Sequence, residues 1–294
     1  MSDMGSSKIL IMGVKITEKS LLLSQILKNM TVKDILDCIT EVAPLQWQES
    51  YDNAGLQVGD LNAEAHKTLI CLDITEEIVD EAITKNCDLI ISHHPLIFKG
   101  LKHLTPQTYT ERAVTKAIKH DIAMISMHTN LDNSYLGVSR VLAERLGLKN
   151  LRILQPATDD PYLYGAGMVG EFENAMEEVD FLQLVANIIS SPCLKHTALT
   201  GRKIKKVALC GGSGSPFMDD AIRQKADAYL TADIKYHDFF IPEGRMLMVD
   251  GGHFETEQFT KELICELVRK KFPTFAAVIA ETNTNAVHYF VKNK

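Results

Sequence analysis

The sequence has few cysteines, and no two of them stand at the C-x-x-C spacing of a zinc ribbon. They are scattered singly along the 294 residues, at Cys38, Cys71, Cys87, Cys193, Cys210 and Cys265. Isolated thiols of this kind are typical of reduced, mostly structural cysteines in an intracellular compartment. A cysteine-based zinc ribbon is therefore not predicted.

The chain also lacks an excess of positive charge and a long apolar run. It carries 31 Lys and Arg residues against 38 Asp and Glu, for a formal net charge of -7. Because the basic residues are dispersed, we do not expect direct binding to nucleic acid, and an anionic substrate would need a local counter-charge such as a metal. No apolar tract approaches the roughly 20 residues that span a bilayer, so no membrane segment is predicted.

Residues 1–30 lack the small-residue cleavage site of a secretory signal after their short apolar patch. Their lysines leave a mitochondrial presequence as an alternative, but the segment contains no arginine and shows little amphipathic order. We interpret it as an N-terminal extension. The expected location is the cytoplasm, with a mitochondrial or nuclear location as alternatives.

From residue 31 onward, apolar runs typical of buried strands alternate with amphipathic helical patterns, and 46% of the whole chain is hydrophobic. This order predicts an α/β fold with parallel strands. Strands are expected at 68–72, 88–92, 122–127 and 206–210, and helices at 76–85, 111–120, 139–148 and 219–225. A turn-rich segment at 155–161 is interpreted as a linker, and we divide the chain into a first α/β half (31–150) and a second (151–294).

The two halves resemble each other in sequence. Residues 80–88 match residues 219–227, which lie 139 positions later, and the strands that follow also align. Each half then contains a strand that leads to a histidine with a carboxylate four residues later, His128 with Asp132 and His253 with Glu257. We interpret this as an internal duplication of one α/β unit, with chance similarity of short segments as the alternative.

Two adjacent histidines, His93 and His94, follow the apolar strand 88–92. Open α/β sheets normally build their sites from the residues just beyond the carboxyl ends of the strands. Neighbouring side chains of a strand point to opposite faces, so one buried and one exposed imidazole is the simpler alternative. Partners elsewhere in the sequence must decide between the two interpretations.

Further metal-ligating residue types stand at the ends of other apolar strands. His253 and Glu257 would lie one turn apart on a helix, and Asp132 follows His128 at the same spacing. Imidazoles combined with carboxylates bind zinc, manganese, iron or cobalt, and a bridging carboxylate allows two ions about 3.5–4 Å apart. Because His93, His94, Asp132, His253 and Glu257 together exceed one tetrahedral shell, we predict two divalent metal ions.

Two glycine-rich segments invite a functional interpretation. Residues 165–170 spell G-x-G-x-x-G, but no helix follows directly, so we expect a glycine-rich strand and not a dinucleotide-binding loop. The second segment consists of Gly211, Gly212, Ser213 and Gly214, between a strand and a helix that starts near Pro216. Free backbone N–H groups there would form an anion-binding site at the start of the helix. The segment lacks the lysine of a P-loop, and a plain tight turn between strand and helix is the alternative.

Together these stretches resemble the NIF-three-like family (NGG-one-interacting factor three), whose bacterial members are called GTP cyclohydrolase I type two homologues. The matching stretches are 47–55, 88–98, 128–137, 211–215, 231–237 and 251–257, spread over most of residues 31–290. The resemblance implies layered α-β-α packing, a dinuclear metal centre in the cleft between two related halves, and a ring-shaped homohexamer. It implies metal ligands at His93, His94, Asp132, His253 and Glu257, with His128 close by. The chain is too short for the extra domain of some bacterial members, and it has Ala286 where a proline is expected.

The resemblance implies a dinuclear-metal-dependent hydrolase that acts on a nucleotide-like substrate, with GTP-cyclohydrolase-like ring opening as the specific reaction. In this reaction His128 or His237 would move a proton, and residues 211–215 would hold phosphates. The alternative is a metal-stabilised scaffold, a partner of a transcription cofactor, without catalysis. The titratable cluster around His237 favours an active site, because a structural ion needs no spare acid or base.

Overall fold

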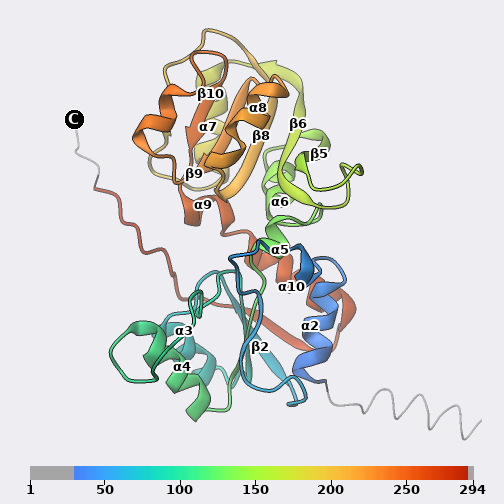
Figure 1. The fold of residues 1–294 in the computed structure, drawn as a ribbon, viewed down its shortest axis with the longest axis vertical. Coiled ribbons are helices and arrows are strands. Elements are labelled where there is room, and N and C mark those ends of the chain that lie inside the picture. Colours follow the sequence, from blue (N-terminus) through green and yellow to red (C-terminus); the bar gives the residue numbers. More distant parts are fainter. Residues whose placement is uncertain (1–29, 291–294) are drawn as a thin grey trace, which may run out of the picture.

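The computed structural model describes residues 30–290, so all of the predicted N-terminal extension except Met30 lies outside the described residues. Two mixed β-sheets flanked by helices lie at opposite ends of an elongated molecule (Figure 1). This arrangement confirms the predicted α/β class. No helix within residues 30–290 is long and apolar enough to cross a membrane.

The first sheet is built around three parallel strands, β2, β3 and β4, with one further strand at each edge. Its strand order is β1 (Gly55–Val58), β4 (Ala123–Ser126), β3 (Leu89–Ser92), β2 (Lys67–Cys71) and β11 (Ala276–Ile279). The edge strand β1 runs antiparallel to β4, whereas β11 runs parallel to β2. The three central strands therefore direct their carboxyl ends to the same edge of the sheet.

Helices cover both faces of the first sheet. Those helices are α2 (Val32–Thr40) and α10 (Thr260–Lys271) on one face and α3 (Glu76–Thr84) and α4 (Tyr109–Lys119) on the other. In β3, Leu89 and Ile91 pack in the first cluster and Ile90 in the second, because alternate strand side chains face opposite ways. This burial on both faces explains why the strand sequence is an uninterrupted apolar run.

The second sheet also centres on three parallel strands, β8, β9 and β10. Its strand order is β5 (Lys149–Pro156), β6 (Gly165–Met176), β8 (Ile204–Ser213), β9 (Ala228–Ala232), β10 (Leu247–Asp250) and β7 (Lys195–His196). Helices α6 (Val138–Arg145) and α7 (Glu178–Ile188) pack on one face, and α8 (Met218–Arg223) on the other. The short helical segments are η1 (Leu45–Trp47), α5 (Thr129–Asp132), η2 (Ser215–Phe217), η3 (Tyr236–Phe240) and α9 (His253–Glu257).

The central strands of the two sheets pair in the same register. Thr68 of β2 lies opposite Leu89 of β3, and Val207 of β8 lies opposite Ala228 of β9. Both residues of the second pair stand 139 positions after those of the first, which is the offset of the sequence match. The strand–helix–strand order is therefore the same in both units.

Two expectations about the chain between and after these units differ from the structure. Residues 155 and 156, interpreted as the start of a linker, end β5 and pair with Ala166 and Gly165 of β6. The division at residue 150 also does not separate the sheets, because α10 and β11 belong to the first sheet. A four-residue edge strand carries no sequence signal for the sheet it joins. The G-x-G-x-x-G segment lies in β6, as expected for a glycine-rich strand.

Candidate metal centre

The candidate ligands lie where the carboxyl ends of the central strands of both sheets meet. His93 and His94 follow β3, and Asp132 ends the short helix α5 that follows β4. From the other sheet, β10 leads through two glycines into α9, which carries His253 and Glu257. Helices α5 and α9 both lie between the two sheets (Figure 1). The fold thus brings together residues that are far apart in the sequence.

Glu257 is the centre of this cluster. Its Oε2 lies 2.9 Å from Nε2 of His94 and 3.0 Å from Nε2 of His253, and its Oε1 lies 3.7 Å from Nε2 of His93. Asp132 approaches from the other side, with Oδ1 3.5 Å from Nε2 of His93. Each of the five predicted ligands therefore has a candidate ligand atom within 3.5 Å of another.

The cluster has the residue types of a metal site and contains buried ligand atoms that lack a hydrogen-bond partner. Three overlapping groups of donor atoms, each within 4.8 Å of one another, could hold an ion: His93, His94 and His128; His94, His253 and Glu257; and His93, Asp132 and Glu257. Within the described part of the chain, Nε2 of His93 and Oδ1 of Asp132 are buried without a hydrogen-bond partner. Buried polar atoms rarely stay unpaired, so these two atoms fit a ligand role.

The other ring nitrogen of each histidine is held by an acceptor. Nδ1 of His93 lies 2.8 Å from the carbonyl oxygen of Met127. Because a carbonyl only accepts, Nδ1 carries the proton, and in the neutral ring the lone pair of Nε2 faces the cluster. Nδ1 of His94 lies 2.7 Å from Oδ1 of Asp73, in the same arrangement with a carboxylate.

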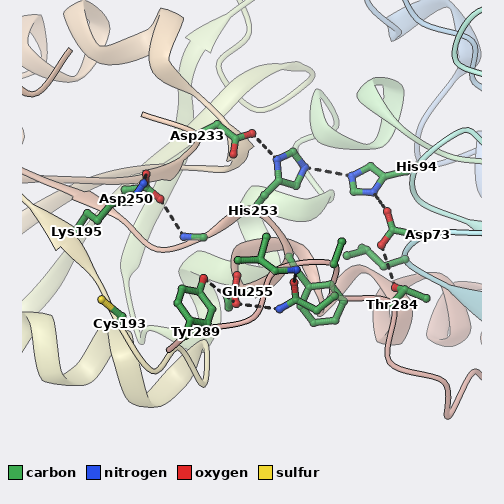
Figure 2. Close-up of a pocket in the computed structure, with 16 residues that line it drawn as sticks. Asp73, His94, Cys193, Lys195, Asp233, Asp250, His253, Glu255, Thr284 and Tyr289 are labelled. Atoms are coloured by element: carbon green, nitrogen blue, oxygen red, sulfur yellow. Dashed lines mark hydrogen bonds and ion pairs between the residues drawn. The ribbon is translucent and has the colours of Figure 1, made fainter. Parts of the chain in front are cut away.

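His128 and His253 repeat this arrangement. Nδ1 of His128 lies 2.7 Å from Oδ1 of Asp52, and Nδ1 of His253 lies 2.7 Å from Oδ2 of Asp233. Carboxylates that hold the outer nitrogen of a histidine are the usual support of metal-ligating imidazoles, because they fix the tautomer and the ring orientation. Figure 2 shows two of these pairs, in which the rings of His94 and His253 face each other across the site.

The buried carboxylates of the cluster and of its supporting residues determine the protonation of the histidines. Burial lowers the pKa of His94, but hydrogen bonds with Asp73 and Glu257 raise it overall to about 10. His253 behaves in the same way, with Asp233 and Glu257 raising its pKa to about 11. Without an ion, protonated imidazoles therefore balance the buried carboxylates. A bound cation would take the place of these protons.

The two buried acids of the cluster respond in opposite directions. Burial, reinforced by the charge of Glu257, raises the pKa of Asp132 to about 7. Burial also disfavours the ionised form of Glu257, but the surrounding histidines outweigh it and hold the pKa well below its usual range. Glu257 is thus the carboxylate that stays charged at the centre of the site.

The glycine segment at the end of β8 lies against the cluster, but its amides are already engaged. The N–H groups of Gly211, Gly212 and Gly214 donate to the hydroxyls of Ser139 (3.3 Å), Thr256 (3.0 Å) and Thr231 (2.8 Å). These three amides therefore have no free hydrogen for an anion. Gly212 instead has a packing role: it has a φ of +62°, and a Cβ there would lie 2.0 Å from Oε1 of Glu257.

The two predicted proton-transfer residues lie in different surroundings. The ring of His128 lies 5.4 Å from that of His93 and 5.5 Å from that of His94, centroid to centroid, so His128 belongs to the cluster. His237 is exposed on η3, where its ring contacts Tyr236 and Phe240. The structure brings His128, but not His237, to the candidate ligands.

Sequence reasoning missed the three carboxylates that hold the histidines, Asp52, Asp73 and Asp233. For one of them a signal was present, because Asp233 occupies the position that the repeat aligns with His94, 139 residues earlier. Asp73 stands two residues after β2 and Asp52 in the loop before β1. Neither position carries a local pattern that would assign it to a particular histidine.

Two cavities reach the cluster from different sides. One of about 500 Å³ is lined by His128, Asp132 and Glu257, and we call it the cleft cavity. The other, of about 480 Å³, is lined by His94 and by residues 284–287 and Tyr289 of the C-terminal segment (Figure 2). His253 lines both cavities. A small molecule in either cavity would therefore contact the candidate metal centre.

The fold and the site define an α/β protein with two mixed sheets and a histidine- and carboxylate-lined cluster that could hold metal ions. The model of the Duf34/NIF3 (NGG1p interacting factor 3) family matches residues 30–286. The chain therefore belongs to this family.

Relatives and solved structures agree with this assignment. The chain is 33% identical to a protein of Clostridium acetobutylicum named GTP cyclohydrolase 1 type 2 homolog, over 78% of this chain and 86% of the relative. A crystal structure of a Staphylococcus aureus protein is 30% identical, with a TM-score of 0.81 over 89% of this chain and 99% of the other. A Bacillus cereus protein described as related to NIF3, at 23% identity, shares the fold with a TM-score of 0.84 over 90% and 100% of the two chains.

Proposed function

We propose that the protein is a hydrolase that depends on two divalent metal ions and acts on a nucleotide-like substrate, with GTP-cyclohydrolase-like ring opening as the specific reaction. The observation that carries the proposal is the position of Glu257 among His93, His94 and His253, beside two buried donor atoms that lack a partner. The name shared by the curated relatives, GTP cyclohydrolase 1 type 2 homolog, supports the substrate class.

The five predicted ligands would hold the ions, and Glu257, whose two oxygens both lie near imidazole nitrogens, would contribute its carboxylate to them. Zinc, manganese, iron and cobalt all suit this donor set. When bound, such ions lower the pKa of a water molecule toward neutrality and offset negative charge on the substrate.

The chain's own residues would position these groups and move the proton. The side chain of Asp52 is fully buried, and it accepts hydrogen bonds from Nδ1 of His128 (2.7 Å) and the backbone N–H of Thr129 (3.0 Å). This fixes the ring so that Nε2 faces the cluster, where it can accept or return a proton. Asp73 and Asp233 orient the rings of His94 and His253 in the same way.

The proposal is tested by metal analysis and by a hydrolysis panel of nucleotides and nucleosides on purified protein. We expect bound divalent metal, turnover that disappears on chelation and returns with metal, and loss of turnover in Glu257→Gln. Glu144→Gln is the matched control, since this exposed residue of α6 pairs with Arg140. Full activity of chelated protein, or of Glu257→Gln, would refute the proposal.

A scaffold role without catalysis is the second candidate. Two exposed aromatic residues of η3 favour it, Tyr236 (74% exposed) and Phe240 (64% exposed), because clustered exposed aromatic rings are typical of protein contact surfaces. In that case chelation would lower the melting temperature, but no compound of the panel would turn over.

Three further expectations remain proposals. We propose a homohexamer, as the family resemblance implies, in which such aromatic surfaces would be buried. We also propose that the two units arose by duplication, which their common strand register supports. The cytoplasmic location stays a prediction.

A further inference from the structure

Among residues 30–290, the basic residues in the wall of the cleft cavity are two histidines of the cluster, His128 and His253. No lysine or arginine lines it among residues 30–290, and none lines the adjoining cavity of about 470 Å³. On the other side of the cluster, Lys195 is the single lysine or arginine that the described residues place in the wall, and it pairs with the buried Asp250 at 2.6 Å. Away from the candidate metal centre, a polyphosphate would therefore find no free lysine or arginine among the described residues that line these cavities.

Part of the wall that the cleft cavity shares with the adjoining cavity offers hydrogen-bond acceptors. Glu49, Asn133 and Gln155 line both this cavity and the adjoining one. Asn133 donates from Nδ2 to Oε1 of Glu49 (3.1 Å), which leaves the carboxylate with capacity to accept more. Gln155 donates from Nε2 to Asp220 (3.2 Å), so that its own carbonyl oxygen is an acceptor. Phosphate oxygens only accept, so the carboxylate of Glu49 offers them no partner.

The remaining walls suit a flat, apolar body. Two aromatic residues, Tyr51 and Phe217, line the cleft cavity, and the backbone of Gly167 and Gly211 forms part of its wall. A volume of about 500 Å³ is within the ordinary range of small-molecule sites, which combine apolar surfaces with a few placed polar groups. These walls favour a planar ring whose edge donates hydrogen bonds.

We propose that the cleft cavity binds an uncharged purine-type heterocycle whose edge offers adjacent N–H donors, as guanine does, and that the ligand is a nucleobase or nucleoside and not a nucleoside triphosphate. Glu49 is the residue that recognises the donor edge. This inference rests on the proposed function, because the cluster at one end of the cavity supplies the chemistry. It narrows the substrate class of the proposed function from nucleotides to nucleobases and nucleosides.

The test measures binding separately from turnover. Metal-loaded protein is titrated with guanosine, adenosine and GTP by calorimetry, and the fluorescence of Trp47, the single tryptophan of the chain, reports where binding occurs. Trp47 stacks on Tyr164 at 4.7 Å, and both line the adjoining cavity that shares Glu49. We expect guanosine to bind at least about tenfold more tightly than adenosine, and GTP to bind no more tightly than guanosine.

Glu49→Gln keeps the shape of the side chain and its contact with Asn133 but removes the charge from the acceptor. We expect it to weaken guanosine binding by about 10- to 100-fold, as for a hydrogen bond to a charged group. Glu41→Gln is the matched control, because Glu41 pairs with Lys271 at the exposed end of α2 and should leave the affinity unchanged. The melting temperature of both variants checks that they are folded.

The outcomes separate this inference from the proposed function. GTP binding more than about tenfold tighter than guanosine, or guanosine binding that is absent or insensitive to Glu49→Gln, overturns the inference, even if metal-dependent hydrolysis of another compound is observed. Guanosine binding that depends on Glu49, without hydrolysis of any compound in the panel, supports the binding site and overturns the hydrolase.

Discussion

Replacement of Gly212 by alanine should disturb the candidate metal centre through one defined collision. The added Cβ would lie 2.0 Å from Oε1 of Glu257 and 3.3 Å from Cε1 of His253. Ordinary contact begins at 3.4 Å, so the carboxylate must move by about 1.4 Å, the difference between the two distances. The positive φ of +62° adds roughly 1–2 kcal/mol of backbone strain.

Gly244→Ala separates these two effects. Gly244 has a similar φ of +72°, but nothing lies within 4 Å of the added Cβ. Both variants should therefore lose a similar free energy of unfolding from backbone strain, whereas only Gly212→Ala displaces a candidate ligand. Because a site tolerates displacements of only about 0.5 Å, we expect Gly212→Ala to lose at least about tenfold in metal affinity.

The assay is competition for the metal with a chromophoric chelator, combined with thermal unfolding of each variant. We expect a lower melting temperature for chelated Gly212→Ala than for chelated Gly244→Ala, because the displaced carboxylate also loses its contacts with His94 and His253. Only Gly212→Ala should bind metal more weakly. Equal metal affinity in Gly212→Ala and Gly244→Ala would refute the proposal that Glu257 is a metal ligand whose position depends on its close contact with Gly212 of β8.

Three further predictions concern stability, pH and proton transfer. Removal of metal that is present at about 1,000 times its Kd should lower the free energy of unfolding by about 4 kcal/mol and the melting temperature by on the order of 10 °C. Calorimetry with and without chelator measures this shift. An unchanged melting temperature would contradict a metal site that forms only in the folded protein. Burial disfavours the ionised form of Glu81, but hydrogen bonds from Lys85 and Thr282 lower its pKa to about 2. The contribution of ionised Glu81 to the free energy of unfolding should thus be complete above pH 4.5 and be lost as the pH falls toward 2. The difference in free energy of unfolding between wild type and Glu81→Gln, measured in urea, should therefore shrink between pH 6 and pH 3. A difference that stays constant with pH would contradict this prediction. Asp52→Asn should reduce turnover by about 10- to 100-fold while metal remains bound, because an NH2 group replaces one of the two oxygens that accept from His128 and Thr129 and the negative charge is lost. Unchanged turnover would exclude this role.

The strands and the candidate ligands could be predicted from the sequence because both leave local signals. Buried parallel strands are short apolar runs, and His93, His94 and His128 each stand directly after such a run. The spacing of His253 and Glu257 matches one helical turn, and the structure has α9 there. Sequence patterns therefore located the carboxyl ends of the strands, where the site lies.

What the sequence could not indicate depends on contacts between distant segments. The hydrogen bond from His128 to Asp52 joins residues 76 positions apart, and no pattern in either segment points to the other. The amides of Gly211 and Gly212 are occupied by hydroxyls of Ser139 and Thr256, which lie 72 and 44 residues away. A glycine-rich turn with engaged amides has the same sequence as one with free amides.

The position of α10 explains how donors from two sheets can share one site. Helix α9 starts from the second sheet, after β10, and α10 follows almost directly and packs on the first sheet through Ile264 and Val268. His253 and Glu257 are thus anchored to the second sheet on one side and to the first on the other. The chain then ends its last strand, β11, beside β2, whose neighbour β3 carries the histidines at 93 and 94. After α9, the chain thus comes back to the first sheet through α10 and β11. This connection keeps His253 and Glu257 of α9 close to His93 and His94.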